Sequence, residues 1–315
     1  MYQAQPTNPT QEGYTTPKVS IGLPVYNGAR FLKEAIDSIL SQTFTDFELI
    51  ICDNDSDDGT AEIALGYARA DSRVRYHRND RNIGAAHNFN KAFSLSRGQY
   101  FKWAACDDIH LPDCLARCVQ VLDSDAKVVL VYPKSSEINE DGTQRTPLLC
   151  PYELDSPHTY HRFHRLLWNP PWYPHMIFGL VRASALAQTR PYAPKRWADY
   201  AILAELALLG PWNQIDEVLF VNRYVTSRWT RTQRFLDPSL PDKIGTSRLP
   251  LYSGQMRAVW DSRLSASQKM LASIDVMVCL VLDYGRRILR AAYLTSRRAA
   301  GAMLAPFRRA LARFF

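Results

Sequence analysis

The chain has 315 residues, of which 46% are hydrophobic and 22% charged, and this globular composition is sufficient for a sizeable core. The net charge is +7, but eight arginines and no acidic residue follow Asp283, so removing these eight charges leaves residues 1–283 at −1. A nearly neutral body argues against a nucleic-acid-binding protein, and no apolar run reaches the length of a membrane span.

Strands and helices are expected to alternate through the first 130 or so residues. We expect strands at residues 18–26, 47–52, 74–77, 100–104 and 128–132, and helices at 31–41, 61–70, 84–95 and 111–122. The run FELIIC at 47–52 is apolar throughout, which is typical of a strand buried on both faces. The alternation predicts an α/β fold: a doubly wound, mainly parallel sheet with helices on both faces.

The second half of the chain is less regular. Residues 134–178 are expected to be irregular, and a strand at 177–181, a helix at 200–209 and a strand at 218–224 follow. Three histidines, His158, His161 and His164, are spaced by three, which favours a solvated helix face over a zinc site. The six cysteines form no C-x-x-C pair, so we expect free thiols in a reducing compartment.

Polar residues follow three of the predicted strands, at 26–27, 53–55 and 107–108. Ligands of doubly wound sheets bind beyond the carboxyl ends of the strands. No glycine-rich phosphate loop is present, so a bound nucleotide would need carboxylates and a metal ion at its phosphates. Asp107 and Asp108 suit Mg²⁺ or Mn²⁺, with a helix N-cap as the alternative. Asp53 could accept a hydrogen bond from a base or could open a local turn.

Three blocks in order resemble family-2 glycosyltransferases over about residues 18–225. They are VSIGLPVYNGARFLKEAIDSILSQTFTDFELIICDNDSDDGT, NIGAAHNFNKAF and GQYFKWAACDDIHLPDCL. The resemblance implies a GT-A-type fold and an inverting transfer from a nucleotide-diphosphate sugar, with a UDP-sugar as the expected donor. It also implies a divalent Mn²⁺ or Mg²⁺ cofactor. The absence of a Q-x-x-R-W block argues against processive polymer synthesis.

The resemblance also assigns roles to single residues. Those assigned to the nucleotide are Pro24, Val25, Tyr26, Asn27, Asp53, Asn82 and Asp107. Asp108, together with Asp107, corresponds to the metal site beside the diphosphate. Asp199 corresponds to the catalytic base, which would remove the proton from the acceptor hydroxyl as that oxygen attacks the anomeric carbon. From the residues alone, Asp199 could equally be a helix N-cap.

The chain departs from the family pattern at three positions. Ala105 replaces an earlier Asp, Ala198 replaces a Glu, and Val225 stands where a metal-binding His is common. Arg223 or Arg228 could help to neutralise the diphosphate instead. The departures keep open an alternative, a catalytically inactive module that binds sugar nucleotides or glycans. A nucleotidyltransferase is disfavoured, because LPVYNGARF is not a Gly- and Lys/Arg-rich phosphate loop.

Aromatic side chains in the second half are candidates for an acceptor-binding wall, since flat rings pack against sugar faces. The candidates are Trp168, Trp172 and His175. Ordinary core or loop packing is the alternative for each of them. The acceptor itself is expected to be a glycan or glycolipid, as in the synthesis of cell-envelope polysaccharides.

The expected organisation has four parts: a disordered lead-in at 1–17, a nucleotide-sugar-binding half at 18–133, an acceptor- and base-bearing half at 134–260, and C-terminal helices at 261–315. In the last part, Arg286, Arg297 and Arg308 recur every eleven residues, as do Arg287, Arg298 and Arg309, which places all six on one side of a helix. We therefore expect an amphipathic tail from about 285 to lie on an anionic membrane surface, with a helix docked on its own domain as the alternative. The expected location is cytoplasmic and peripheral, on the inner face of the cell membrane, with no nucleic-acid partner.

Overall fold

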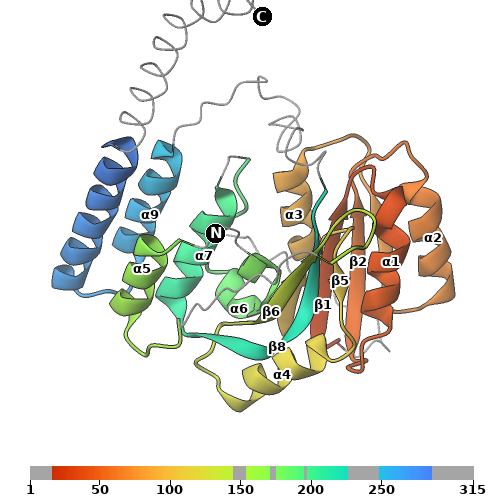
Figure 1. Cartoon of the computed structure of the whole chain (residues 1–315), viewed down its shortest axis with the longest axis horizontal. Helices are drawn as coiled ribbons and strands as arrows, with labels where there is room; N and C mark the ends of the chain where they lie inside the picture. The colour runs from red at the N-terminus through yellow and green to blue at the C-terminus, as the bar shows by residue number, and fades with distance from the viewer. Residues whose placement is uncertain (1–15, 145–153, 171–174, 195–196, 226–247, 286–315) are drawn as a thin grey trace, which may run out of the picture.

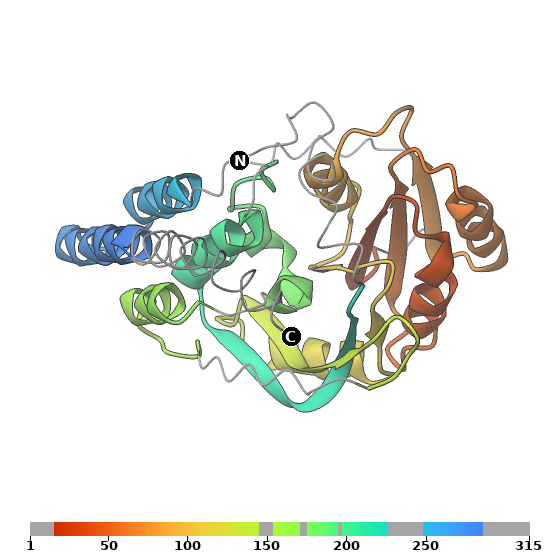
Figure 2. The ribbon, with the colours of Figure 1, turned by 45° about the horizontal axis from the view of Figure 1, so that its top comes forward.

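A single mixed sheet forms the centre of the computed structural model, and helices cover both of its faces (Figures 1 and 2). The structure describes residues 16–144, 154–170, 175–194, 197–225 and 248–285. The strands are β1 (Val19–Val25), β2 (Phe47–Asp53), β3 (Val74–Arg78), β4 (Tyr100–Trp103), β5 (Ile109–His110), β6 (Leu130–Ile138), β7 (Leu180–Arg182) and β8 (Trp212–Arg223). Their order across the sheet is β3-β2-β1-β4-β7-β6-β8-β5.

The first half of the sheet is parallel, as the sequence predicts. β1 pairs in parallel with β2 and β4, and β2 pairs in parallel with β3. Every residue of β1 and β2 is buried, which agrees with a strand covered on both faces. Val25 pairs with Asp53 at the last position of both strands, so the loops after β1 and β2 leave the sheet side by side.

The second half of the sheet is mixed and differs from the prediction in its bounds. β7 is antiparallel to both β4 and β6, and β5 is antiparallel to β8 at the edge. β6 continues to Ile138, and β8 begins as early as Trp212, because the two strands pair in parallel along most of their length. The register shifts at Pro133, which has no N–H to donate. The polar end of β6 therefore owes its strand conformation to pairing with β8.

Helices cover both faces of the sheet. They are α1 (Ala29–Leu40), α2 (Thr60–Ala70), α3 (Ala85–Ser94), α4 (Cys114–Ser124), α5 (Thr159–Trp168), α6 (Ala183–Leu186), α7 (Ala198–Leu209) and α9 (Leu249–Asp261), with a 3₁₀ turn η1 (His175–Phe178) and a helix at 266–285. Helices α5 and α9 pack mainly against α7 at one end of the molecule (Figures 1 and 2). One core joins the sheet to α1, α2 and α4, and a second core joins it to α3, α5, α7 and α9. Side chains alternate between the two cores along β4, where Tyr100 belongs to the first core and Phe101 to the second.

The last described helix, residues 266–285, lies at one end of the molecule beyond α5 and α9 (blue in Figures 1 and 2). Ala272 and Val276 are buried in the second core and attach the helix to the domain. In the part of the chain that the structure describes, no helix combines the length and apolarity needed to cross a membrane. The lead-in up to residue 15 and the arginine-rich residues 286–315 lie outside the described residues.

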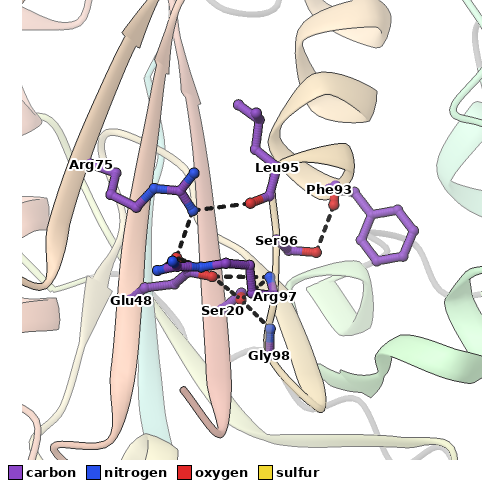
Figure 3. A network of polar contacts seen from close by, with 8 residues as sticks. All are labelled: Ser20, Glu48, Arg75, Phe93, Leu95, Ser96, Arg97 and Gly98. Carbon is purple, nitrogen blue, oxygen red and sulfur yellow. Dashed lines mark hydrogen bonds and ion pairs between the residues drawn. The ribbon is translucent and has the colours of Figure 1, made fainter. Parts of the chain in front are cut away.

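A buried carboxylate joins the strands near the amino ends of β1 and β2, at the opposite end of these strands from the polar loops (Figure 3). Glu48 of β2 accepts hydrogen bonds from Ser20 Oγ of β1 at 2.7 Å, from Arg75 Nη1 of β3 at 2.7 Å and from Arg97 Nη2 before β4 at 2.8 Å. Burial alone would raise the pKa of Glu48, but the hydrogen bonds from Ser20, Arg97 and Arg75 outweigh burial and hold the pKa below its ordinary value of 4.5. One ionised side chain thus stabilises the order β3-β2-β1-β4.

We expect Glu48→Gln to lower the free energy of unfolding at pH 7 by about 2 kcal/mol, because two arginines lose their shared carboxylate. A lowered folded-state pKa means that this stabilisation is present above 4.5 and is lost as the pH falls through the folded-state pKa. Urea unfolding at pH 7 and at lower pH should therefore show a difference between variant and wild type that narrows in acid. The control is Glu217→Gln, since Glu217 pairs with Arg117 at the surface. An equal loss of stability in both variants would contradict the role of Glu48.

Candidate functional site

Three loops meet at the carboxyl ends of β1, β2 and β4. The loops after β1 and β4 are in direct contact at Gly28: a Cβ there would lie 2.6 Å from Val25 Cγ2 and 3.0 Å from Cys106 Sγ. Only glycine allows this approach without a shift, and Cys106 directly precedes Asp107. The polar residues that follow three separate strands in the sequence are therefore brought to one place.

The loops after β1 and β2 are also linked by hydrogen bonds. Asn27 N donates to Ser56 Oγ at 2.9 Å, and Asn27 Oδ1 accepts from Asp57 N at 3.0 Å. Ala29 N, at the start of α1, donates to Asp58 Oδ2 at 3.1 Å. Asn27 adopts a left-handed conformation, with φ of 51°, which asparagine tolerates well. These bonds fix the loop after β1 within the protein itself.

Asp53, at the end of β2, is fully buried and largely satisfied by its neighbours. Oδ1 accepts from the Ser56 amide at 2.9 Å and from Ser56 Oγ at 2.6 Å, and Oδ2 accepts from Tyr76 Oη at 2.7 Å. Burial and this last bond raise the pKa of Tyr76 to about 12. A carboxylate has about four acceptor positions, and these bonds use three of them. Asp53 thus holds the turn that follows β2, which is the alternative role that the sequence offered. Its contact with a nucleotide base stays a prediction.

A small pocket opens beside these loops. It is lined by Pro24, Val25, Tyr26, Asn54, Asn82, Ala85, Asn88 and Phe89. Four of the residues that the sequence assigned to the nucleotide line this pocket, namely Pro24, Val25, Tyr26 and Asn82. Asn54 belongs to the polar segment 53–55 that the sequence placed at a strand end. Asn88 was not predicted, although the repeated Asn in NIGAAHNFN was a signal for it.

The asparagines around the pocket form a chain of side-chain hydrogen bonds. Asn54 Nδ2 donates to Asn82 Oδ1 at 2.8 Å, and Asn79 Nδ2 donates to Asn54 Oδ1 at 2.9 Å and to Asn88 Oδ1 at 3.0 Å. Asn88 Nδ2 donates to the carbonyl of Cys52 at 2.7 Å, which anchors the chain on β2. Each amide is held in one orientation, so the pocket presents fixed donors and acceptors to a polar ligand.

Asp107 and Asp108 follow β4 and are both buried. Asp108 Oδ1 accepts from Asn222 Nδ2 at 2.9 Å and from the Arg223 amide at 3.0 Å, both at the end of β8. The N-cap of α4 is Asp113, so the helix-cap alternative for the aspartate pair is wrong. That helix starts at Cys114, later than the sequence predicted, because the Leu111 amide donates to the Leu219 carbonyl at 3.0 Å and so continues the pairing of β5 with β8.

Arg223 supports the aspartate loop and has a different role from the one expected. Its Nε donates to the Asp107 carbonyl at 3.1 Å, its Nη2 bonds Glu34 Oε2 at 2.5 Å, and its guanidinium lies 4.6 Å from the centroid of the Phe31 ring. The side chain is buried among these partners, so it is committed to holding the loop. Arg228, the other candidate for neutralising a diphosphate, lies outside the described residues.

The aspartate pair has the chemistry of a divalent cation site. Carboxylate oxygens are the ligands that Mg²⁺ and Mn²⁺ prefer, and the N–H donors on Asp108 orient its carboxylate in the way that outer partners orient metal ligands. Among the described residues, no three His, Cys, Asp or Glu side chains lie together as a complete cation site. An ion at this pair would therefore take further ligands from a bound phosphate or from water.

Asp199 lies in the first turn of α7. The N-cap of that helix is Trp197, in a left-handed conformation with φ of 70°, so the N-cap alternative for Asp199 is wrong. Although part of the residue is exposed, the protein packed around the carboxyl group removes water from it, and this burial raises the pKa of Asp199 to about 6. A carboxylate with such a pKa is ionised at pH 7 and is a better base than an ordinary aspartate.

The three candidates for an acceptor wall are not brought together by the described contacts. Trp168 Nε1 donates to Asp275 Oδ1 at 3.0 Å, toward the helix at 266–285. His175 is buried, with its ring centroid 6.2 Å from that of Phe220 in β8, and burial lowers its pKa to about 3. Trp172 lies outside the described residues. The acceptor wall stays a prediction.

The histidine-bearing segment is helical, as the spacing of the histidines favoured, so the expectation of an irregular stretch over 134–178 is wrong for residues 159–168. His161 and His164 lie on α5 and His158 at its N-cap, and His164 Nδ1 lies 2.8 Å from Asp275 Oδ2. The five cysteines among the described residues are free thiols. Cys150 lies outside the described residues.

Comparison with known proteins gives one family and a consistent fold. The model of glycosyl transferase family 2 matches residues 20–186, more than half of the chain. An uncharacterized glycosyltransferase of Rickettsia felis is 36% identical over 131 residues, which are 40% of this chain and 21% of the relative. Chondroitin synthase of Escherichia coli is 28% identical over 210 residues, 65% of this chain and 28% of the relative. The chain thus matches only about a quarter of the length of these two relatives.

Two solved structures share the fold at low identity. TarS of S. aureus in complex with UDP has a TM-score of 0.61 at 14% identity, covering 82% of this chain and 70% of that one. The mannosyltransferase PcManGT of Pyrobaculum calidifontis, in complex with GDP-Man and Mn²⁺, has a TM-score of 0.51 at 18% identity, covering 93% and 83%. These likenesses establish the GT-A-type α/β fold.

The raised pKa of Asp199 predicts a pH-dependent stability. Because the folded-state pKa is about 6 and the ordinary value is 3.8, ionisation opposes folding, and stability falls as the pH rises from 3.8 through 6. Across this pH window, the free energy of unfolding of the wild type should fall by up to about 3 kcal/mol relative to that of Asp199→Asn, as measured by urea unfolding. The control is Asp155→Asn at an exposed carboxylate. If the free energy of unfolding depends on pH in the same way in both variants and in the wild type, the carboxyl of Asp199 is not desolvated.

Proposed function

This chain belongs to glycosyl transferase family 2, and we propose that it moves a sugar from a nucleotide-diphosphate sugar to a hydroxyl of a glycan or glycolipid with inversion. One observation carries the proposal. The buried pair Asp107 and Asp108 ends β4 beside the loops that follow β1 and β2, where the pocket opens. That arrangement offers carboxylates for the metal and diphosphate next to a polar cavity for the nucleoside.

The nucleoside would occupy the pocket after β1 and β2. The ring of Tyr26 is 38% exposed and offers a flat surface, while Asn54, Asn82 and Asn88 offer oriented amides. Asp53, with three of about four acceptor positions in use, would accept a hydrogen bond from a base N–H. Structural neighbours in complex with UDP and with UDP-GlcNAc support a UDP-sugar, and the neighbour with GDP-Man makes guanosine the alternative to be tested.

Asp107 and Asp108 would hold Mn²⁺ or Mg²⁺, and the neighbour in complex with Mn²⁺ supports such an ion. When bound, the ion would supply positive charge against the leaving diphosphate. Asn222 and the Arg223 amide keep Asp108 Oδ1 in one orientation, so the carboxylate is ready before the ligand arrives. Val225, which stands in the place of a frequent histidine ligand, leaves the ion dependent on these aspartates and on the phosphates.

Asp199 would act as the general base. Its carboxylate accepts the proton of the acceptor hydroxyl while that oxygen forms a bond to the anomeric carbon. The bond from the anomeric carbon to the diphosphate breaks, and its electron pair leaves with the diphosphate. Attack and departure on opposite faces invert the configuration. The pKa of about 6 suits this step, because the group is ionised at pH 7 and still has substantial proton affinity.

The C-terminal sequence supports a proposal for the acceptor and for the site of action. Eight arginines and no acidic residue lie beyond Asp283, which supports contact of residues 285–315 with an anionic membrane. We place the enzyme at the inner face of the cell membrane, in the cytoplasm, where a lipid-linked acceptor of an envelope polysaccharide would be accessible.

The donor site is tested by calorimetric binding of a panel of UDP-, GDP- and TDP-sugars with Mn²⁺, with Mg²⁺ and without metal. We expect one donor to bind in a metal-dependent manner and Asp108→Ala to abolish that dependence. Asn222→Ala should weaken metal-dependent binding about 10- to 100-fold, because Asp108 loses an orienting donor. Asn213→Ala, on the same strand, is the control. If no donor binds under any metal condition, the proposal fails, and the fold serves an inactive glycan-binding module.

The base is tested by turnover of the donor identified above, with donor hydrolysis or transfer as the readout. Asp199→Asn should lower kcat by about 10²- to 10⁴-fold and leave donor affinity unchanged, because the amide cannot accept the proton. The wild-type kcat should rise as the pH increases through about 6, where Asp199 ionises. The control variant Asp155→Asn should have the same kcat and the same pH dependence of kcat as the wild type. Full turnover in Asp199→Asn would exclude this residue as the base.

A further inference from the structure

The helix at 266–285 presents an apolar face to solvent. Met270, Leu271, Ile274, Met277, Val281 and Leu282 each have between 43% and 64% of their surface exposed. Four of them, at 270, 274, 277 and 281, follow the spacing of four and three residues that forms one continuous face of a helix. Scattered exposed apolar residues are ordinary, but a contiguous stripe marks an interaction surface.

The outward direction of this stripe is fixed by the contacts on the opposite face of the helix. Asp275, which is 8% exposed, accepts hydrogen bonds from Tyr160 Oη at 2.9 Å and Trp168 Nε1 at 3.0 Å, and it pairs with His164 Nδ1 at 2.8 Å. All three partners lie on α5. Turning the stripe inward would break these bonds and expose Ala272 and Val276, so the apolar face belongs to the folded state.

The charged side chains of the helix at 266–285 are bound to partners within the domain. The charged residues of this helix are Lys269, Asp275 and Asp283. Asp275 is bound to α5, Asp283 bonds Arg248 Nη1 at 3.1 Å, and Lys269 Nζ donates to the Trp260 carbonyl at 2.8 Å. Trp260, at the end of α9, is 60% exposed, and this bond holds its backbone against the start of the stripe. Tryptophan is enriched at membrane–water interfaces, where its ring is partly inserted.

We propose that this stripe, with Trp260 at its edge, is the lipid-contacting part of a docking surface for an anionic bilayer. The helix leads directly into residues 286–315, whose eight arginines have no acidic residue among them. An apolar face continuous with a strongly basic segment matches an anionic membrane in both hydrophobicity and charge. This inference adds a folded surface to the proposed membrane contact of residues 285–315, and it does not depend on sugar transfer.

A second copy of the chain is a poorer match for the same face. Residues 1–283 have a net charge of −1 and offer little opposite charge to eight arginines. The eight arginines that follow the stripe in the sequence would give each copy the same charge, and repulsion between like charges opposes a dimer. The bilayer is an occupant that supplies both an apolar interior and negative charge.

The test is flotation of the full chain with vesicles of phosphatidylcholine alone or mixed with phosphatidylglycerol. The stripe variant is Ile274→Gln, Met277→Gln and Val281→Gln together. The control is Leu65→Gln, Leu209→Gln and Val218→Gln, three apolar residues of 38% to 42% exposure elsewhere on the surface. We expect wild type and control to bind the mixed vesicles, and the stripe variant to bind at least about tenfold more weakly. In brominated lipid, Trp260→Phe should show less quenching than wild type.

Several results would overturn the proposal. These are a wild type that binds neither vesicle, a stripe variant that binds mixed vesicles as well as the control does, and an unchanged quenching signal in Trp260→Phe. A wild-type dimer in light scattering that becomes monomeric in the stripe variant would assign the face to a second copy instead. Calorimetric donor binding by the stripe variant separates the two proposals, because it should equal that of wild type even if transfer to a lipid acceptor falls.

Discussion

The candidate site depends on the hydrogen bonds that Asp108 accepts from Asn222 and from the Arg223 amide. They join the end of β4 to the end of β8 across 114 positions of the chain, so the two halves of the sheet meet at one carboxylate. Arg223 continues the connection to the Asp107 carbonyl and to Glu34 of α1. The orientation of the Asp108 carboxylate therefore depends on both halves of the sheet, and substitutions in β8 that move Asn222 should change it.

Three carboxylates show how the surroundings decide what one chemical group does. Glu48 is buried with two arginines, and its lowered pKa makes it a stabilising link between strands. Asp53 is buried with Ser56 and Tyr76, and it holds the loop that forms one side of the pocket. Asp199 has burial without a compensating cation, so its pKa rises to about 6, which suits proton transfer. Glu48 thus lies near the amino end of β2, and Asp53 lies at the carboxyl end of the same strand, beside the pocket.

The C-terminal part of the described structure serves a different purpose from the sheet. Asp275 and its three partners on α5 attach the helix at 266–285 to the domain, and the same contacts turn its apolar stripe outward. In the proposed arrangement, the nearly neutral residues 1–283 carry the transferase site, and the basic residues that follow contact the membrane. An enzyme with a lipid-linked acceptor would benefit, because docking confines it to the surface where that acceptor is found.

The sequence by itself determined the parallel half of the sheet, the aspartates at its strand ends and the family. Apolar runs such as FELIIC and the polar residues after them are local patterns, which can be recognised in the sequence without knowing which strands pair. Only the tertiary structure decided the length of β6 and β8, the asparagine chain around the pocket, the supporting role of Arg223 and the raised pKa of Asp199. Each of these arises from groups distant in the chain, through strand pairing, hydrogen bonding or removal of water, and no spacing within a segment encodes them.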